Sequence, residues 1–404
     1  MARDISWHGT SLLALALALG LGGCMSAAPP QANRGPAPGP VAEAPPPAAT
    51  GAINGPTIGT GKARVGLILP LSGPGQGAVA AASLRNAAEM AVAEFQGPDI
   101  TLLVKDDKGT PEGAREAASQ AIAEGAELII GPLFAGSVQA VGQVARQAGR
   151  PVMAFSTDTT AATRGVYLLS FLPQAEVDRV VDHAASQGKQ SFAALIPDTA
   201  YGNVVEAAFR EAAARRGARV VAVERYAAGQ APAAVGRIAA VIGGASPQAD
   251  ALFLPEAGDA LPAVGQALAE ARFDPKRVKP IGTGVWNDPR VFKIAALQGG
   301  WFAAPDQAGY NAFAGRYRTR YSAEPARIAT LSYDAVSLAA ALTKTQGSQR
   351  FTEPVLTNPS GFAGADGTFR FKPDGTNDRT LAVMEIKGGG AAPVSPAPRV
   401  LAAR

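Results

Sequence analysis

Residues 65–95 combine a short apolar run, a glycine-rich loop and a helical pattern, and few folds accept this order of elements. The run at 65–69 (VGLIL) has the length and composition of a strand that is buried on both faces. The loop at 70–77 is rich in glycine and proline, and beyond it apolar residues recur at helical spacing from Leu84 to Phe95. These elements open a βαβ unit, and the loop lies at the strand end where open α/β sheets bind ligands.

The same alternation of apolar runs and amphipathic segments continues along the chain. Thr110 and Pro111 predict the start of a helix, and Gly125 its end. Strands that alternate with helices of about 10–15 residues favour parallel, doubly wound sheets. A turn at 373–375 between apolar runs predicts a hairpin of 369–371 with 381–386. The other predicted strands are 100–104, 128–130, 151–155, 166–171, 192–196, 220–226, 251–254, 280–281 and 300–303.

Residues 1–23 have the features of a signal peptide. The apolar run at 11–21 has the length of a secretory segment and is too short to span a bilayer. It ends at Leu21-Gly22-Gly23-Cys24, which matches the bacterial lipobox, and Cys24 is the only cysteine among 404 residues. We therefore expect a lipid on Cys24 that anchors the protein on the periplasmic side of the cell envelope. An ordinary signal peptide that contains a cysteine is the alternative. Because Met25 follows the cysteine, where an aspartate would favour the inner membrane, we favour the outer membrane.

Composition excludes several classes of site. The net charge of +4 arises from 37 basic and 33 acidic residues without a basic block, so we expect no binding to nucleic acid. A single cysteine and only two histidines leave no pattern for a metal site, and we expect no cofactor. No nucleophile–base pair or G-x-S-x-G elbow occurs, and the loop at 73–77 lacks the lysine of a phosphate-binding loop. A carboxylate pair of Asp198 and Glu256 is the one enzymatic alternative, and we predict a protein that is not an enzyme.

Four local motifs resemble the type I periplasmic binding proteins, the leucine/isoleucine/valine-binding family. They are the loop at 70–74 (PLSGP), the turn at 130–132 (IGP) with Ser137 in the next helix, the strand end at 155–157 (FST), and Asp198-x-x-Tyr201-Gly202. The resemblance extends from about residue 64 to residue 387. It implies an α/β fold of two lobes, each a doubly wound parallel sheet, joined by three hinge crossovers. Ligand then lies in the cleft between the lobes.

The resemblance also suggests domain limits. We place the crossovers near 172–173, 304–305 and 346–350. The expected parts are a signal peptide at 1–23, the lipidated Cys24 with a tether rich in proline, alanine and glycine at 24–62, the N-terminal lobe at 63–172 and 305–348, the C-terminal lobe at 173–304 and 349–387, and a flexible tail at 388–404.

Amino-acid binders of the family hold the ligand carboxylate with hydroxyl groups and backbone N–H groups at strand ends and helix starts. Such positions suit an anion because a helix N-terminus presents free donors and partial positive charge. Serine and threonine at these positions are also ordinary helix caps, and the tyrosine in the list below is equally compatible with a core or rim position. The expected ligand-binding residues are Ser72, Gln76, Ser137, Ser156, Thr157, Tyr201, Glu256 and Trp286.

One departure from the family concerns the ligand ammonium. The family places an acid in the loop that corresponds to 282–285, and this loop has none before Asp288. Glu256 and Asp158 follow other strands and are possible substitutes. Burying an ammonium without a partner in a closed cleft costs on the order of several kcal/mol. The absence of the acid therefore argues against binding of a free amino acid. Trp286, in a polar loop at a strand end, suggests stacking on a ligand or partner.

Two functions follow from the resemblance. The first is a lipid-anchored solute-binding protein that captures an amino acid or short peptide for an ABC permease. The second is similar to the penicillin-binding-protein activators, lipoproteins that bind and stimulate a peptidoglycan synthase. The segments 286–289 (WNDP) and 297–302 (LQGGWF) resemble that branch, as do the lipobox and its long tether. The absent acid favours the second function, and the retained hydroxyl residues favour the first.

Overall fold

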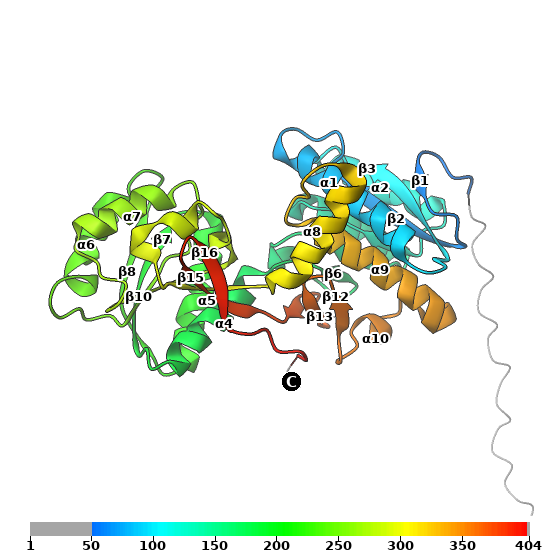
Figure 1. Cartoon of the computed structure of the whole chain (residues 1–404). Helices are drawn as coiled ribbons and strands as arrows, with labels where there is room; N and C mark the ends of the chain where they lie inside the picture. Colours follow the sequence, from blue (N-terminus) through cyan, green and yellow to red (C-terminus); the bar gives the residue numbers. More distant parts are fainter. Residues whose placement is uncertain (1–50, 402–404) are drawn as a thin grey trace, which may run out of the picture. The chain divides into compact units, whose positions relative to one another are not determined.

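The structure, a computed structural model, describes residues 51–401 of the chain. The predicted signal peptide, Cys24 and most of the predicted tether lie outside the described residues. The alternation of strands and helices is confirmed, and Figure 1 shows it as helices packed on both faces of parallel-dominated sheets.

The first sheet has six strands in the order β1-β3-β2-β4-β5-β6. All neighbouring strands run parallel except β1 and β3. Helices α1 and α9 cover one face and α2 and α3 cover the other, while α8 packs on α1. The strands are β1 (Thr57–Ile58), β2 (Ala63–Leu69), β3 (Ile100–Asp106), β4 (Leu128–Ile130), β5 (Val152–Ala154) and β6 (Val166–Leu168). The helices are α1 (Gln76–Glu94), α2 (Pro111–Ala123), α3 (Ala135–Gln147), α8 (Gln307–Tyr321) and α9 (Ala329–Gln346).

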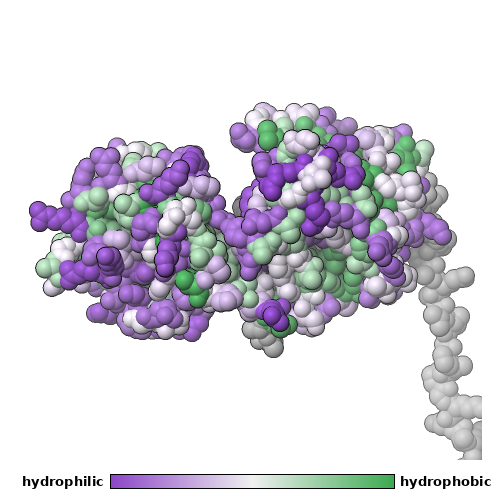
Figure 2. Space-filling model, in the orientation of Figure 1, coloured by the Kyte–Doolittle hydropathy of each residue, from purple (hydrophilic) through white to green (hydrophobic). Residues whose placement is uncertain are grey.

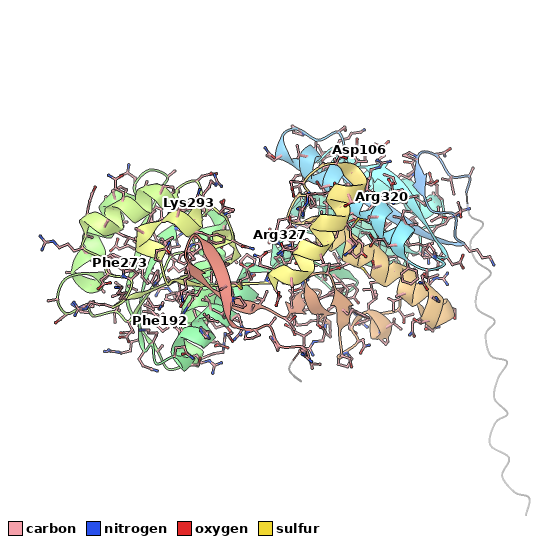
Figure 3. The ribbon with its side chains drawn as sticks, in the orientation of Figure 1. Asp106, Phe192, Phe273, Lys293, Arg320 and Arg327 are labelled. Atoms are coloured by element: carbon pink, nitrogen blue, oxygen red, sulfur yellow. The ribbon has the colours of Figure 1, made fainter. Side chains whose placement is uncertain are left out.

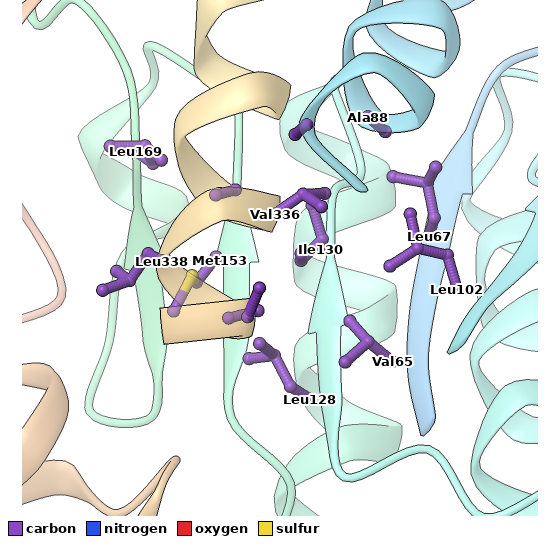
Figure 4. Close-up of a cluster of buried hydrophobic side chains, with 14 of the residues drawn as sticks. Val65, Leu67, Ala88, Leu102, Leu128, Ile130, Met153, Leu169, Val336 and Leu338 are labelled. Atoms are coloured by element: carbon purple, nitrogen blue, oxygen red, sulfur yellow. The ribbon is translucent and has the colours of Figure 1, made fainter. Parts of the chain in front are cut away.

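The core of the first sheet explains the continuous apolar run at its centre. Val65 and Leu67 of β2 point to the face under α1 and α9, where Ala88 and Val336 meet them (Figure 4). Ile68 points to the opposite face and joins the core under α2 and α3. A strand buried on both faces needs apolar residues at successive positions, so β2 shows no apolar–polar alternation.

The second sheet has seven strands in the order β16-β15-β11-β10-β9-β7-β8. The five neighbouring strands β11, β10, β9, β7 and β8 run parallel to one another. β15 pairs antiparallel with β11, and β16 pairs antiparallel with β15. Helices α4 and α5 cover one face, α6 and α7 the other. The strands are β7 (Ser191–Pro197), β8 (Arg219–Tyr226), β9 (Ala251–Phe253), β10 (Lys279–Gly282), β11 (Trp301–Ala304), β15 (Ala382–Lys387) and β16 (Gly390–Ser395). The helices are α4 (Pro173–Ser186), α5 (Ala200–Arg215), α6 (Ala231–Ile242) and α7 (Leu261–Glu270).

The predicted hairpin near the end of the chain is wrong in its pairing. The turn at 373–375 joins β13 (Gly367–Phe371) to β14 (Asn377–Arg379), and β12 (Phe362–Gly364) completes a three-stranded sheet. The second predicted strand, β15, instead pairs with β11. Three polar or charged residues make β14 invisible to a search for apolar runs.

Two further predictions near the end of the chain also need correction. Phe369 and Phe371 pack in the core of the first sheet, so the chain stays with that sheet to β14 and crosses at 380–381 rather than at 346–350. Residues 390–395, expected in a flexible tail, form β16 on the edge of β15. Backbone pairing to an existing sheet edge stabilises such a strand without requiring large apolar side chains.

The described end of the predicted tether is fixed to the first sheet. Lys105 and Glu124 form a buried ion pair of 2.8 Å, and the Asn54 backbone N–H donates to the same carboxylate over 3.1 Å. β1 then pairs with β3. A buried ammonium needs several acceptors, and the backbone near Asn54 supplies one of them.

Figure 2 shows hydrophilic side chains over most of the face in view, with hydrophobic residues in smaller groups between them. Among residues 51–401, none of the helices combines the length and apolar character that crossing a membrane requires.

Candidate ligand-binding site

A cavity of about 330 Å³ lies where the chain crosses between the first and second sheets. We call it the hinge cavity. Its walls come from the crossover before α4, the crossover after β11, the loop after β10 and the loop between α8 and α9. The lining residues are Thr157, Phe171, Pro173, Glu176, Tyr201, Gly284, Val285, Asn287, Ala304, Pro305 and Arg327.

Glu176 supplies the acid of the hinge cavity. It lies in the first turn of α4, is only 7% exposed, and accepts a hydrogen bond of 2.9 Å from the Gly284 backbone N–H. A Cβ atom at position 284 would lie 2.6 Å from Glu176 Oε1, so a larger residue there would displace the carboxylate from its present position. The first turn of a helix favours an acidic residue because of the free N–H groups and the positive end of the dipole.

Burial raises the pKa of Glu176 to about 8, although the Gly284 hydrogen bond and the positive charge of Arg327 act in the opposite direction. Taking a carboxylate out of water disfavours its charged form. Near neutral pH this carboxyl group is therefore mainly protonated in the free protein. A cation placed beside it would restore the ionised form.

Arg327 supplies the positive charge of the hinge cavity and lies in the loop between α8 and α9 (Figure 3). Its guanidinium binds both oxygens of the fully buried Asp366 at 2.7 and 2.9 Å. The same group lies 4.8 Å from the ring centre of Phe171 and 4.4 Å from that of Tyr310. Two aromatic rings and a bidentate carboxylate fix its orientation, and 32% of the side chain stays exposed.

Three neutral polar side chains complete the hinge cavity. The Tyr201 hydroxyl lies 2.6 Å from Thr283 Oγ1, and burial raises the pKa of this phenol, which therefore stays protonated. Asn287 lines the cavity, and its Oδ1 accepts a hydrogen bond of 2.7 Å from Gln307, the first residue of α8. Thr157 follows β5 and is exposed. A buried acid, a fixed cation and hydroxyl groups around one small cavity suit a ligand that carries both an ammonium and a carboxylate.

A second cavity of about 580 Å³ adjoins the hinge cavity and shares Tyr201 and Val285 with it. We call it the apolar cavity, because alanine and proline side chains at the ends of β7, β8 and β9 make up much of its wall. Its main polar pair is Tyr226 and Glu256, whose hydroxyl and carboxylate lie 2.8 Å apart. The predicted ligand residue Glu256 therefore lies in this cavity, where it accepts a hydrogen bond from a phenol.

Five predicted ligand-binding residues line neither cavity: four polar residues and Trp286. Ser72 is exposed and its backbone N–H donates to Asp106 Oδ1 over 3.2 Å, while Gln76 is the exposed first residue of α1. Ser137 is buried in α3, and its hydroxyl has no hydrogen-bond partner within the described residues. Ser156 is buried and accepts from the Asp158 backbone N–H over 3.1 Å. Of the predicted hydroxyl set, only Thr157 and Tyr201 line the hinge cavity.

The structure contradicts the predicted role of Trp286. Its side chain is completely buried in the core of the second sheet, with its ring centre 6.4 Å from that of Phe302. A Cβ atom at Gly282 would lie 2.3 Å from the indole, so the loop after β10 leaves no room for an acidic side chain at that position. The carboxylate comes to this loop from α4 instead.

Sequence reasoning missed Glu176 and Arg327. Their sequence context indicates no ligand contact, because Glu176 lies in the first turn of a helix, where acidic residues are common, and Arg327 lies in a connection between two helices. Their closeness to predicted crossovers was the available signal, because crossovers border the cleft in a two-lobed fold. Within residues 51–401, no group of three or more His, Cys, Asp or Glu side chains is placed to hold a metal ion.

The fold is shared by many solved binding proteins. A protein from Rhodospirillum rubrum described as a branched-chain amino acid ABC transporter superposes with a TM-score of 0.72 at 19% identity, over 82% of this chain and 99% of that one. A branched-chain amino acid ABC transporter ligand-binding protein from Burkholderia xenovorans gives 0.65 at 18% identity, over 83% and 96%. A Desulfitobacterium hafniense substrate-binding protein in complex with Leu gives 0.60 at 19% identity, over 82% and 99%.

The similarity in sequence points the same way. No curated protein matches this chain significantly. A family model, described as periplasmic binding protein, matches residues 62–391, which is most of the chain and includes the hinge cavity and all strands of both sheets except β1 and most of β16. The predicted α/β fold of type I periplasmic binding proteins is thus confirmed, and the chain belongs to the periplasmic binding protein family.

Proposed function

We propose that this protein binds a small solute with an ammonium and a carboxylate group, an amino acid or short peptide, in the hinge cavity. The observation that carries the proposal is the buried Glu176 carboxyl group on the cavity wall, held against the Gly284 N–H. A buried acid without a cationic partner is unfavourable, and a ligand ammonium relieves this. Glu176 thereby takes the role of the acid that the loop at 282–285 lacks.

The remaining walls of the hinge cavity fit the rest of such a ligand. The Arg327 side chain stays 32% exposed and its guanidinium is held in one orientation, which suits a ligand carboxylate. Tyr201 and Val285 line both the hinge cavity and the apolar cavity, so an apolar side chain of the ligand has a neighbouring volume to enter. Small organic ligands occur in solved relatives of this fold, including leucine and, in a protein from R. palustris, benzoate.

The cellular role that best accounts for these features is delivery of the solute to an ABC permease. The protein would act on the periplasmic side of the envelope, held to the membrane by a lipid on Cys24. Capture would involve closure of two lobes about the crossovers that line the hinge cavity. We assign no catalytic step to the site, because the chemistry of its residues is accounted for by binding.

A thermal-shift panel on the full chain tests the proposal. Amino acids, short peptides, simple carboxylates and peptidoglycan fragments are compared, and ligand at 100 times its Kd adds about 2.7 kcal/mol of stability. We expect ligands that carry an ammonium to raise the melting temperature of the wild type, and to leave that of Glu176→Gln unchanged. The control Glu116→Gln, whose altered side chain is 77% exposed, should respond like the wild type. No shift with any compound, together with retention of a peptidoglycan synthase on the immobilised chain, would favour the activator function instead.

A further inference from the structure

A third cavity lies at the opposite edge of the first sheet, away from the hinge cavity. Its volume is about 460 Å³, and residues just before β4, β5 and β6 contribute to its wall. The last turn of α3 and the segment at 348–353 complete it. Thr157 of the hinge cavity follows β5, whereas Pro151 of this cavity precedes it, so the two cavities lie at opposite ends of the same strand.

The charges of this cavity do not balance, and we call it the arginine cavity. Four guanidinium groups line it against two carboxylates. Arg350 pairs with Glu127 at 2.6 Å and Arg164 pairs with Glu353 at 2.7 Å. The other two guanidinium groups belong to Arg146 and Arg150, and neither has a carboxylate partner in the described part of the chain. The Arg150 Nε atom is buried and has no hydrogen-bond partner there.

The negative end of the α3 dipole does not compensate the positive charges of both Arg146 and Arg150. Arg146 lies in the last turn of α3 and Arg150 shortly after it, where basic side chains interact favourably with the helix dipole. That dipole is equivalent to roughly half a negative charge. The helix end therefore compensates only part of the positive charge of the exposed Arg146 and the half-buried Arg150.

Tyr167 adds a further donor to the wall of the arginine cavity. Its ring packs 5.3 Å from that of Phe371, and burial, followed by the charge of Glu353, raises its pKa to about 12. The phenol stays protonated at neutral pH and remains able to donate a hydrogen bond.

We propose that the arginine cavity binds a small dianionic ligand with a phosphate group, such as a phosphate monoester, independently of the solute in the hinge cavity. Guanidinium groups match phosphate oxygens in a bidentate geometry, and two uncompensated guanidinium groups match a dianion. The volume of about 460 Å³ lies within the range of small-molecule sites, which is roughly 300–1,000 Å³.

Both a soluble phosphate and a lipid headgroup offer this chemistry. The described chain starts near the same edge of the sheet, since Gly51 O accepts from Arg64 over 3.1 Å and the Glu127 N–H donates to Arg64 O over 2.8 Å. Glu127 lines the arginine cavity. The segment that leads toward the predicted anchor thus begins beside the cavity, so the membrane is a possible source of the phosphate.

The test uses the full chain and two probes with the same phosphate monoester. Isothermal titration with glycerol 3-phosphate, with glycerol as the neutral control, measures a soluble ligand. Sedimentation with phosphatidylcholine vesicles that contain phosphatidic acid measures a membrane ligand. Arg146→Gln/Arg150→Gln should weaken binding at least tenfold, since it removes both guanidinium groups that have no carboxylate partner in the described part of the chain.

Two further variants make the result specific. Arg210→Gln/Arg237→Gln removes two exposed guanidinium groups from the second sheet's helices and should leave binding unchanged. Arg146→Lys/Arg150→Lys keeps both charges at the helix end and should still weaken binding several-fold, because ammonium groups lose the bidentate geometry. Variant-sensitive binding of the soluble probe identifies a soluble phosphate, and variant-sensitive binding of vesicles alone identifies a lipid. Binding of neither probe, or equal binding by the glutamine variant, would overturn the proposal.

Discussion

Replacing Glu176 by glutamine should make the protein more stable at neutral pH while removing its ligand affinity. Burial raises the pKa of this group from 4.5 in the unfolded chain to about 8 in the folded protein. Between these two values the folded state holds a proton that the unfolded state has released. The unfolded state is therefore favoured increasingly as pH rises through this window. Glutamine has nearly the shape of the protonated acid, keeps an acceptor for the Gly284 N–H and does not titrate.

The two pKa values determine the size of the effect. At pH 7 the difference in ionisation lowers the free energy of unfolding of the wild type by about 3 kcal/mol, and at pH 5 by about 1 kcal/mol. Glu176→Gln should thus be more stable than the wild type by these amounts. A gain of stability on losing a functional group is expected where a site holds a polar group in an unfavourable environment.

Urea unfolding at pH 5 and pH 7, followed by circular dichroism, measures both free energies. Glu116→Gln serves as the control, because this exposed carboxyl group should change stability by less than about 0.5 kcal/mol at either pH. If Glu176→Gln is no more stable than the wild type at pH 7, Glu176 is not the buried, unpaired acid described above, and the reasoning fails.

Three further predictions concern the same region. Affinity for an amino acid, measured by calorimetry, should fall about 50-fold from pH 8 to pH 6. The reason is that the ligand binds the ionised form of Glu176, whose pKa is about 8. An affinity that does not change between these pH values would contradict this. Gly284→Ala should lower stability by about 1–3 kcal/mol and abolish binding, since its Cβ would lie 2.6 Å from Glu176 Oε1; unchanged melting and affinity would show that the loop adjusts freely. Trp286→Ala should destabilise the protein by about 3–5 kcal/mol in urea unfolding, as expected for a large core residue, and a loss of binding without loss of stability would restore a ligand-contacting role.

The sequence was informative wherever burial decided the structure. Continuous apolar runs such as that of β2 and the cap formed by Thr110, which accepts from the Gly113 N–H over 3.1 Å, follow from local chemistry. Pairing between distant segments does not. β14 is polar and acquires its place by pairing with β13, whose Phe369 and Phe371 pack under α9, and by hydrogen bonds from Asn377 to the backbone oxygens of Leu168 and Ser170.

The site shows the same division. Thr157 and Tyr201 follow strands at the expected edge and do line the hinge cavity. Ser72 and Ser156 also follow strands, but each lies in neither cavity and has a hydrogen bond within its own sheet edge, Ser72 to Asp106 and Ser156 to Asp158. Glu176 reaches the loop at 284 across 108 positions of sequence, and no local pattern predicts such a contact.

Calorimetric titration of the best amino-acid or peptide ligand from the panel, beside its N-acetylated form, tests most directly whether Glu176 binds a ligand ammonium. Acetylation removes the positive charge and leaves the carboxylate and side chain in place. We expect the wild type at pH 8 to bind the free amine at least 100-fold more tightly, and Glu176→Gln to lose this preference, since removing one partner of a buried charge pair costs about 3–5 kcal/mol. Equal affinity of the wild type for both forms would contradict the proposed site.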